Sequence, residues 1–167
     1  MNKLHLAGVV RESIVDGPGI RYTVFAQGCP HRCQSCHNPQ TWCFEGGVET
    51  DTGRIISEMK KNPMLKGLTL SGGEPFCQGM PMAELAREAH SSGYDVITYT
   101  GFTFEELLNK AKTEEGVLAL LEETDILVDG PFIQDQKSYD LRFRGSANQR
   151  IIDVKSSLNG SIVTAAF

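Results

Sequence analysis

Three closely spaced cysteines are the residues of this sequence best suited to chemistry. Cys29, Cys33 and Cys36 follow the pattern Cys-x3-Cys-x2-Cys in a loop bordered by glycine and proline. Such short spacers allow three thiolates to converge on one inorganic centre, and soft sulfur ligands suit an iron–sulfur cluster or zinc. A 4Fe-4S cluster held by only three cysteines keeps one iron open to a non-protein ligand. The pattern therefore predicts a cluster that can bind and reduce a substrate.

The other cysteines and histidines leave alternatives open. The chain has five cysteines, an odd number that makes a poor disulfide framework, and in a cytosolic protein such clustering indicates metal or redox chemistry. A structural zinc site would need a fourth ligand, which His31, His37 or Cys43 could supply. His31 could instead donate a hydrogen bond to cluster sulfur. Cys77, and Cys43 if it is not a ligand, fit the role of small buried hydrophobes.

A second segment with chemical potential is Gly72-Gly73-Glu74-Pro75, which follows the apolar run at 67–71. Two adjacent glycines let the backbone come close to a ligand and offer it unobstructed N–H and C=O groups. The carboxylate of Glu74 suits an ammonium group. The same carboxylate could equally cap the turn that follows, so both roles are open.

The elements that must position these segments alternate between strands and helices, which is typical of an α/β fold. Apolar runs predict strands at 22–27, 67–71, 95–99, 126–128 and 151–154. Helical spacing predicts helices at 52–61, 81–92 and 103–123, the last interrupted near Gly116. Parallel strands carry chemistry at their carboxyl ends. We therefore expect the cysteine loop, the glycine segment, Thr100 and Asp129 to share one rim.

Length and charge set further bounds. The chain has 167 residues and a net charge of −5, which predicts a single domain over 1–167 with no overall attraction to nucleic acid. A complete (β/α)8 barrel needs upward of about 200 residues, so any barrel must be partial. Neither a membrane span nor a secretory signal is expected, which favours the cytoplasm. A local patch of Arg142, Arg144 and Arg150 could hold a phosphate, a carboxylate or an acidic surface of a protein partner, or could simply be three solvated arginines.

The two motifs, in this order and position, resemble those of the radical S-adenosylmethionine (SAM) enzymes. A finer resemblance joins them to the activating proteins of anaerobic (class III) ribonucleotide reductases. It is carried by Asp-Gly-Pro-Gly-Ile-Arg at 16–21, Cys-His-Asn-Pro at 36–39, the segment 125–132 and the segment 144–150. The matching positions span 16–150 in one collinear order. The segment 16–19 itself has the residues of a turn.

The resemblance implies a fold, cofactors and partners. The fold would be an open, partial β/α barrel of about five mainly parallel strands. The cofactors would be a 4Fe-4S cluster with one open iron, and SAM, which the reduced cluster cleaves to methionine and a 5′-deoxyadenosyl radical. The partners would be the anaerobic reductase, whose C-terminal glycine loop receives the radical, and a flavodoxin or ferredoxin type of electron donor. About five strands would leave an open side into which that glycine loop could thread.

The resemblance also implies roles for individual residues. The cluster ligands would be Cys29, Cys33 and Cys36. The residues that contact SAM would be Ser35, Cys36, His37, Gly72, Gly73, Glu74, Thr100 and Asp129. In the wider superfamily an aromatic residue usually stands before the third cysteine, whereas this chain has Ser35. Adenine stacking by that side chain is therefore excluded, and a backbone contact or the ring of His37 would have to replace it.

Two other functions are compatible with parts of the pattern. One is an activase of another glycyl-radical enzyme, of the pyruvate formate-lyase type, which shares the cysteines and the segment 16–19. The segment 144–150 favours the reductase instead. The other is a zinc or iron–sulfur module without catalysis, which would give the segment 72–75 no role. Metal analysis tests this second alternative: zinc without sulfide would favour a module without catalysis, whereas about four irons and four sulfides per chain would not.

Overall fold

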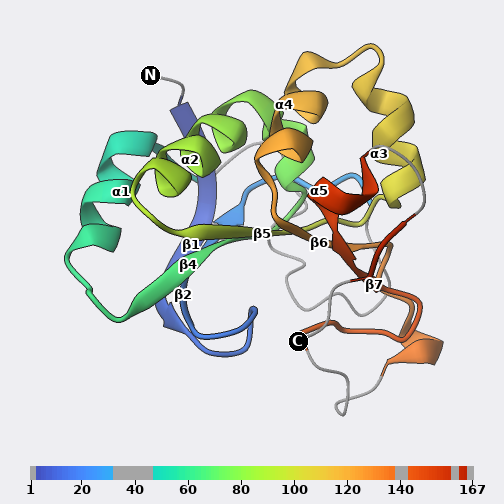
Figure 1. Cartoon of the computed structure of the whole chain (residues 1–167), viewed down its shortest axis with the longest axis horizontal. Helices are drawn as coiled ribbons and strands as arrows, with labels where there is room; N and C mark the ends of the chain where they lie inside the picture. The colour runs from blue at the N-terminus through green and yellow to red at the C-terminus, as the bar shows by residue number, and fades with distance from the viewer. Residues whose placement is uncertain (1–2, 32–46, 138–142, 159–161, 165–167) are drawn as a thin grey trace.

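The computed structural model describes residues 3–31, 47–137, 143–158 and 162–164, and is built around one seven-stranded sheet (Figure 1). The strand order is β3-β1-β2-β4-β5-β6-β7. The strands are β1 (Lys3–Ser13), β2 (Ile20–Ala26), β3 (Val48–Asp51), β4 (Leu65–Gly72), β5 (Asp95–Tyr99), β6 (Ile126–Asp129) and β7 (Arg150–Asp153). The helices are α1 (Thr52–Lys60), α2 (Gly79–Ser91), α3 (Phe104–Ala111), α4 (Glu115–Glu123) and α5 (Val154–Ser157). Two 3-10 turns, η2 (Pro75–Gln78) and η3 (Gln134–Gln136), complete the described elements.

The centre of the sheet confirms the predicted α/β fold. Strands β2, β4, β5 and β6 run parallel to one another, so their carboxyl ends lie along one edge. The expected fifth strand, β7, pairs antiparallel with β6. Within the described ranges the sheet stays open, with β3 and β7 as its outer strands. The open, partial barrel with a mainly parallel centre is therefore the architecture of this chain.

Two further strands, β1 and β3, were not predicted from the sequence. Strand β1 pairs antiparallel with both β2 and β3, and its pairing with β2 shifts register between Leu6 and Gly8 and again between Val10 and Ser13. These irregularities break the regular alternation of apolar and polar residues that marks a strand. Strand β3 is four residues long and partly exposed, so it has no apolar pattern to detect. The expected count of about five strands is thus too low by two.

The core lies between the sheet and the helices, which Figure 1 shows together on one side of β4 and β5. Strand residues such as Val24, Leu68 and Leu70 are fully buried there against helix residues such as Met82 and Leu120. Removal of this apolar surface from water is the main favourable term that holds helices to sheet. The part of the chain that the structure describes contains no helix long and apolar enough to cross a membrane.

The helix boundaries follow local signals. Helix α3 begins with the capping box that Thr103 and Glu106 predict, each side chain bonding the backbone N–H of the other. The interruption in the 103–123 helix lies at 112–114, earlier than the predicted position near Gly116. Gly116 instead packs within α4 against Gly79 of α2, where a Cβ on Gly79 would come within 2.5 Å of the Gly116 carbonyl. The glycine serves close helix packing, which periodicity does not distinguish from a break.

On the other face of the sheet, a fully buried arginine holds the 14–19 connection between β1 and β2. The guanidinium of Arg21 donates to the hydroxyl of Thr69 (2.7 Å), to the carbonyl of Leu68 (2.9 Å) and to the carbonyl of Pro18 (3.2 Å). It also forms an ion pair with Asp95 at the start of β5. One side chain thereby links β2, β4 and β5 to the predicted turn.

Asp16 fastens the same connection from its other end. Its carboxylate accepts hydrogen bonds from the hydroxyls of Ser13 (2.5 Å) and Thr23 (3.1 Å), and its carbonyl accepts one from Thr69 (2.9 Å). Gly17 and Gly19 have φ angles of +133° and +77°, which side-chain-bearing residues rarely adopt. The segment 16–19 is therefore a turn fixed by side chains, as its residues predict, and β2 begins directly after it.

A cluster of charged side chains around His90 joins the end of α2 to the segment between α4 and β6. The imidazole of His90 contacts the carboxylates of Glu123 (3.0 Å) and Asp125 (2.7 Å). Arg87 approaches Glu123, and Lys155 pairs with Asp125. Burial opposes the charged imidazole, but its hydrogen bonds to Asp125 and Glu123 outweigh this and raise the pKa of His90. Burial also opposes ionisation of Asp125, yet its bonds from His90, Val96 N–H and Lys155 lower its pKa.

This cluster predicts a pH dependence of stability. A raised folded pKa means that the contribution of His90 is complete below the unfolded value of about 6.5 and is lost as pH rises through the folded pKa. The lowered pKa of Asp125 acts in the opposite sense and is lost as pH falls below about 4. Urea unfolding of the metal-free protein should show that His90→Asn costs more stability at pH 5.5 than at pH 8.5. An equal cost at both pH values would contradict this assignment.

Candidate functional site

The carboxyl ends of the four parallel strands bring most of the described site residues to one edge of the sheet. Cys29 follows β2, Gly72 ends β4 and Gly73 follows it, Thr100 follows β5, and Asp129 ends β6. Hydrogen bonds link successive loops, among them Thr100 hydroxyl to Glu74 and Gly130 N–H to the carbonyl of Phe102 (2.8 Å). Cys33, Ser35, Cys36, His37 and Arg142 lie outside the described residues. The shared rim predicted from the parallel strands is observed for the others.

The first cysteine stands close to the glycine segment. Cys29 is buried, with 8% of its surface exposed, directly after Gly28, whose φ of +101° turns the chain away from β2. The carbonyl of Gly28 accepts a hydrogen bond from the N–H of Glu74 (2.7 Å). A buried thiol at the carboxyl edge of a parallel sheet, beside a glycine-rich loop, is a suitable place for one ligand of an iron–sulfur cluster.

The two glycines have a packing reason that the sequence did not reveal. Gly72 has a φ of +94°, and a Cβ on it would lie 2.4 Å from the backbone nitrogen of Ala26. A Cβ on Gly73 would lie 2.3 Å from the carbonyl oxygen of Gly28. A side chain at position 72 would therefore push β4 away from the end of β2, and one at position 73 would push the β4 loop away from the start of the cysteine loop. Their predicted contact with SAM stays a prediction.

Glu74 is fully buried, and its carboxylate accepts hydrogen bonds from several donors of this chain. The hydroxyl of Thr100 lies 2.9 Å from both carboxylate oxygens, and the N–H of Gly101 lies 2.8 Å from Oε1. The N–H of Phe76 lies 3.1 Å from Oε2 and makes Glu74 the N-cap of η2. The capping role left open by the sequence is thus observed. A direct contact of Glu74 with SAM stays a prediction.

The fourth donor to Glu74 is a residue whose role here the sequence did not indicate. The Nε2 of His31 lies 2.6 Å from Oε1 of Glu74, so the described part of the cysteine loop is tied to the glycine segment. In this structure the ring of His31 therefore faces a carboxylate. The only sequence signal was the position of His31 between two cysteines, which fits a zinc ligand or a donor to sulfur equally well.

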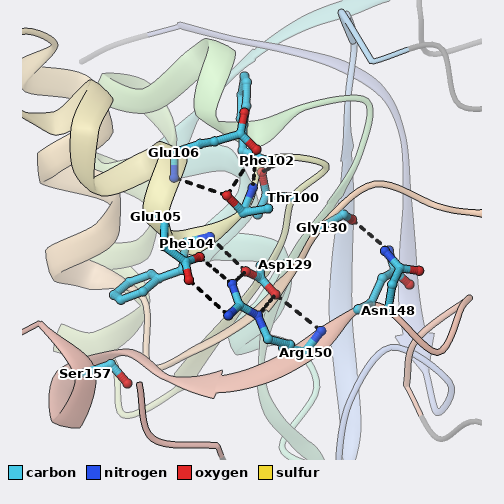
Figure 2. A network of polar contacts seen from close by, with 12 residues as sticks. Thr100, Phe102, Phe104, Glu105, Glu106, Asp129, Gly130, Asn148, Arg150 and Ser157 are labelled. Atoms are coloured by element: carbon cyan, nitrogen blue, oxygen red, sulfur yellow. Dashed lines mark hydrogen bonds and ion pairs between the residues drawn. The ribbon is translucent and has the colours of Figure 1, made fainter. Parts of the chain in front are cut away.

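At the end of β6, Asp129 is held by Arg150, as Figure 2 shows. The guanidinium of Arg150 bonds Asp129 and also Glu105 (2.6 Å), while the Asp129 carboxylate accepts from the N–H of Phe104 at the start of α3 (2.8 Å). These bonds to carboxylates raise the pKa of Arg150, and the bond from Arg150 lowers the pKa of Glu105. The arginine thus holds two carboxylates of its own chain.

Arg144 also has a partner within the chain. Its Nη1 donates to the carbonyl of Gln149 (2.7 Å), and its buried Nε has no acceptor among the described residues. Gln149 in turn receives the N–H groups of Gly145 and Ser146 through its side-chain oxygen. The segment 144–150 therefore folds back on itself beside β6 and β7. Contact of these arginines with a protein partner stays a prediction.

Cys77 offers a control for the ligand assignment. Cys77 is exposed, so its predicted role as a small buried hydrophobe is wrong. Partial removal of its sulfur from water, with smaller effects of nearby Glu74 and Cys29, still raises the pKa of the Cys77 thiol to about 11, so it stays protonated at neutral pH. Within the described ranges, no three metal-binding side chains gather. We expect Cys77→Ser to leave the iron and sulfide content of the reconstituted protein unchanged, and Cys43→Ser likewise. Loss of iron in either variant would contradict the three-cysteine assignment.

Comparison with known proteins defines the class first. A family model described as a 4Fe-4S single cluster domain matches residues 15–152, most of the chain. The chain thus belongs to a class of proteins that carry a single 4Fe-4S cluster domain. The solved structure of QueE from Escherichia coli is also similar, with a TM-score of 0.48 and 15% identity over 60% of this chain and 54% of that chain.

Curated relatives then identify the particular family. The anaerobic ribonucleoside-triphosphate reductase-activating protein of Vibrio cholerae is 37% identical over 146 residues, which cover 83% of this chain and 90% of the relative. Its namesake from Haemophilus influenzae is 36% identical with the same coverage, and that from Escherichia coli K12 is 37% identical over 81% of this chain and 90% of its own. The chain belongs to the family of anaerobic ribonucleoside-triphosphate reductase-activating proteins.

Proposed function

We propose that this protein activates an anaerobic ribonucleotide reductase by reductive cleavage of SAM at a 4Fe-4S cluster. The observation that carries the proposal is the placement of Cys29 beside the Gly72–Gly73 loop at the carboxyl edge of the parallel strands, in a chain whose relatives are named reductase-activating proteins. When bound, the cluster would supply one electron that splits SAM into methionine and a 5′-deoxyadenosyl radical, which takes a hydrogen atom from a glycine of the reductase.

The protein's own residues would bind and orient these groups. Cys29, with Cys33 and Cys36, would hold three irons and leave the fourth for the amino and carboxylate groups of SAM. The backbone of Gly72 and Gly73 would line the methionine end, because no side chain stands there to obstruct it. Ser35, His37, Thr100 and Asp129 are proposed for the adenosine end. In this arrangement Glu74 would shape the loop through the hydrogen bonds that its carboxylate accepts from Thr100 and Gly101.

The open sheet suits a protein substrate. A radical enzyme that acts on a small molecule must enclose both radical and substrate, whereas a glycine loop could enter from the side that the sheet leaves open and complete the wall itself. The electron donor we propose is a flavodoxin or ferredoxin. A cytoplasmic location is proposed with it, because thiolate ligands require a reducing compartment.

The test is an anaerobic assay of the reconstituted protein. Iron and sulfide are added, then SAM and a strong one-electron reductant, and 5′-deoxyadenosine is quantified by chromatography. The proposal expects about four irons and four sulfides per chain and formation of the nucleoside, with none from a Cys36→Ala control. Zinc without sulfide, or a fully loaded cluster that forms no nucleoside even with the reductase present, would instead favour a module without catalysis.

A further inference from the structure

One buried glutamate, Glu74, contacts the cysteine loop at two points, one on either side of Cys29. The backbone N–H of Glu74 donates to the carbonyl of Gly28 (2.7 Å), one residue before Cys29. The carboxylate of Glu74 meets Nε2 of His31 (2.6 Å), two residues after it. Both contacts are shielded, because Glu74 is fully buried and the His31 side chain is only 15% exposed. The buried thiol of Cys29 is therefore bracketed by two bonds to the same residue.

The ring of His31 is also fixed from the side of β5. A Cβ on Gly101 would lie 2.4 Å from Cδ2 of His31, so the ring packs directly on the bare backbone of that glycine. The ring of Phe102 meets His31 edge to face, with centroids 4.4 Å apart. Such an aromatic pair contributes beyond its buried area. Three loops, those after β2, β4 and β5, thus converge on one imidazole.

The Glu74 carboxylate joins these loops chemically as well. Its Oε1 accepts from His31, from the hydroxyl of Thr100 and from the N–H of Gly101. Hydrogen bonds that involve a carboxylate are stronger than neutral ones, and burial strengthens them further. Loss of the His31 side chain would therefore loosen the start of the cysteine loop. The parallel sheet would stay folded, because its core does not depend on this contact.

We infer that His31 is a positioning residue, which locks the cysteine loop to Glu74 and so fixes Cys29 relative to the Gly72–Gly73 loop. The inference rests on the proposed function and deepens it, since it names what holds the cluster loop against the SAM loop. In this arrangement the imidazole of His31 bonds Glu74, and only the three cysteines would ligate the cluster. The placement of the ring also explains why position 101 is glycine, because any side chain there would displace the ring.

The first test needs no cluster and no activity. The metal-free, reduced protein is treated with a thiol-alkylating reagent, and the rate at Cys29 is followed by peptide mass spectrometry. We expect His31→Ala to raise the alkylation rate of Cys29 about 10-fold, and Glu74→Gln to raise it similarly. The double variant should do little more than either alone, because the two residues form one contact. The rate at Cys77 is the internal control for His31→Ala and should not change there. It is no control for Glu74→Gln, because Glu74 caps η2 and its charge acts on the Cys77 thiol.

The second test uses the reconstituted enzyme. Loss of an outer partner of a metal site costs about 10- to 100-fold in affinity or activity, so we expect His31→Ala to keep its iron but to raise KM for SAM by at least about 10-fold. The electron paramagnetic resonance (EPR) spectrum of its reduced cluster should respond less to SAM. His31→Gln should recover most of both, because its amide can donate to Glu74 from near the Nε2 position. The control is His5→Ala, which removes an exposed imidazole that contacts Glu49 and keeps the backbone bonds of His5; it should match the wild type.

The outcomes separate the inference from the proposed function. Iron loss in His31→Ala as complete as in Cys29→Ala would make His31 a ligand and overturn the inference. So would unchanged Cys29 alkylation together with an unchanged KM for SAM. If His31→Ala does not fold, Gly101→Ala, which pushes the ring aside, replaces it and should raise Cys29 alkylation as well. If the wild-type protein itself cleaves no SAM, the proposed function fails, while the alkylation result still decides the inference.

Discussion

Replacement of Cys29 by alanine should abolish cluster binding and SAM cleavage together. Loss of one thiolate leaves two protein ligands for a cluster that already lacks a fourth. The contacts of Glu74 with Gly28 and His31 would then have no cluster ligand between them to position. Because loss of an outer partner of a metal site already costs about 10- to 100-fold, we expect loss of a ligand to lower 5′-deoxyadenosine formation by at least about 10³-fold. Iron and sulfide analysis with chromatography of the nucleoside measures both effects.

The matched control is Cys77→Ser, which removes a thiol from the same side of the molecule without touching the cysteine loop. It should retain wild-type iron and activity. Circular dichroism of the metal-free Cys29→Ala protein should show a folded chain, because the core between sheet and helices does not include this side chain. Wild-type iron content in Cys29→Ala would contradict the ligand assignment.

Replacement of Arg21 by methionine should produce a large loss of stability. Methionine fills most of the volume but donates no hydrogen bond, so the acceptors on Thr69, Leu68 and Pro18 lose their donor and the pair with Asp95 is broken. Breaking a buried ion pair of this kind costs about 3 to 5 kcal/mol. We expect the lower end, about 3 kcal/mol, because Asp95 is partly exposed and water can solvate it after the change. Urea unfolding of the metal-free protein measures the difference.

Two variants make this result interpretable. Arg21→Lys keeps the charge but not the planar set of donors, so it should recover only part of the lost stability. Asp95→Asn leaves the guanidinium its three neutral acceptors and should cost less than Arg21→Met. A loss below about 1 kcal/mol for Arg21→Met would show that the 14–19 turn is held by Asp16 and its own backbone instead.

The sequence predicted the parts of the fold whose residues repeat with a clear period. Strands β4, β5 and β6 and helices α1 to α4 bury continuous or helically spaced apolar residues, so local patterns were enough to locate them. Strands β1 and β3 and the direction of β7 were not predictable in this way. Their placement depends on pairing with distant strands and on register shifts, which leave no period in the sequence.

For the site, the sequence predicted which loops meet but not how their side chains are arranged. The cysteine and glycine motifs indicated chemistry by residue type alone. The bonds from His31, Thr100 and Gly101 to Glu74 arise only when three loops distant in sequence converge at the ends of parallel strands. Arg21 carries no local signal either, because its partners lie on β4 and β5. The roles of Cys33, Ser35, Cys36, His37 and Arg142, outside the described residues, stay predictions.

Radical transfer to the reductase is the property that most directly tests the proposed function. The reconstituted wild-type protein is mixed anaerobically with SAM, a reductant and the anaerobic ribonucleotide reductase of the same organism, and the EPR spectrum is recorded. We expect a glycyl-radical signal that depends on SAM and disappears with Cys29→Ala or with a reductase whose C-terminal glycine is replaced by alanine. Formation of 5′-deoxyadenosine without any radical on the reductase would contradict the proposed partner.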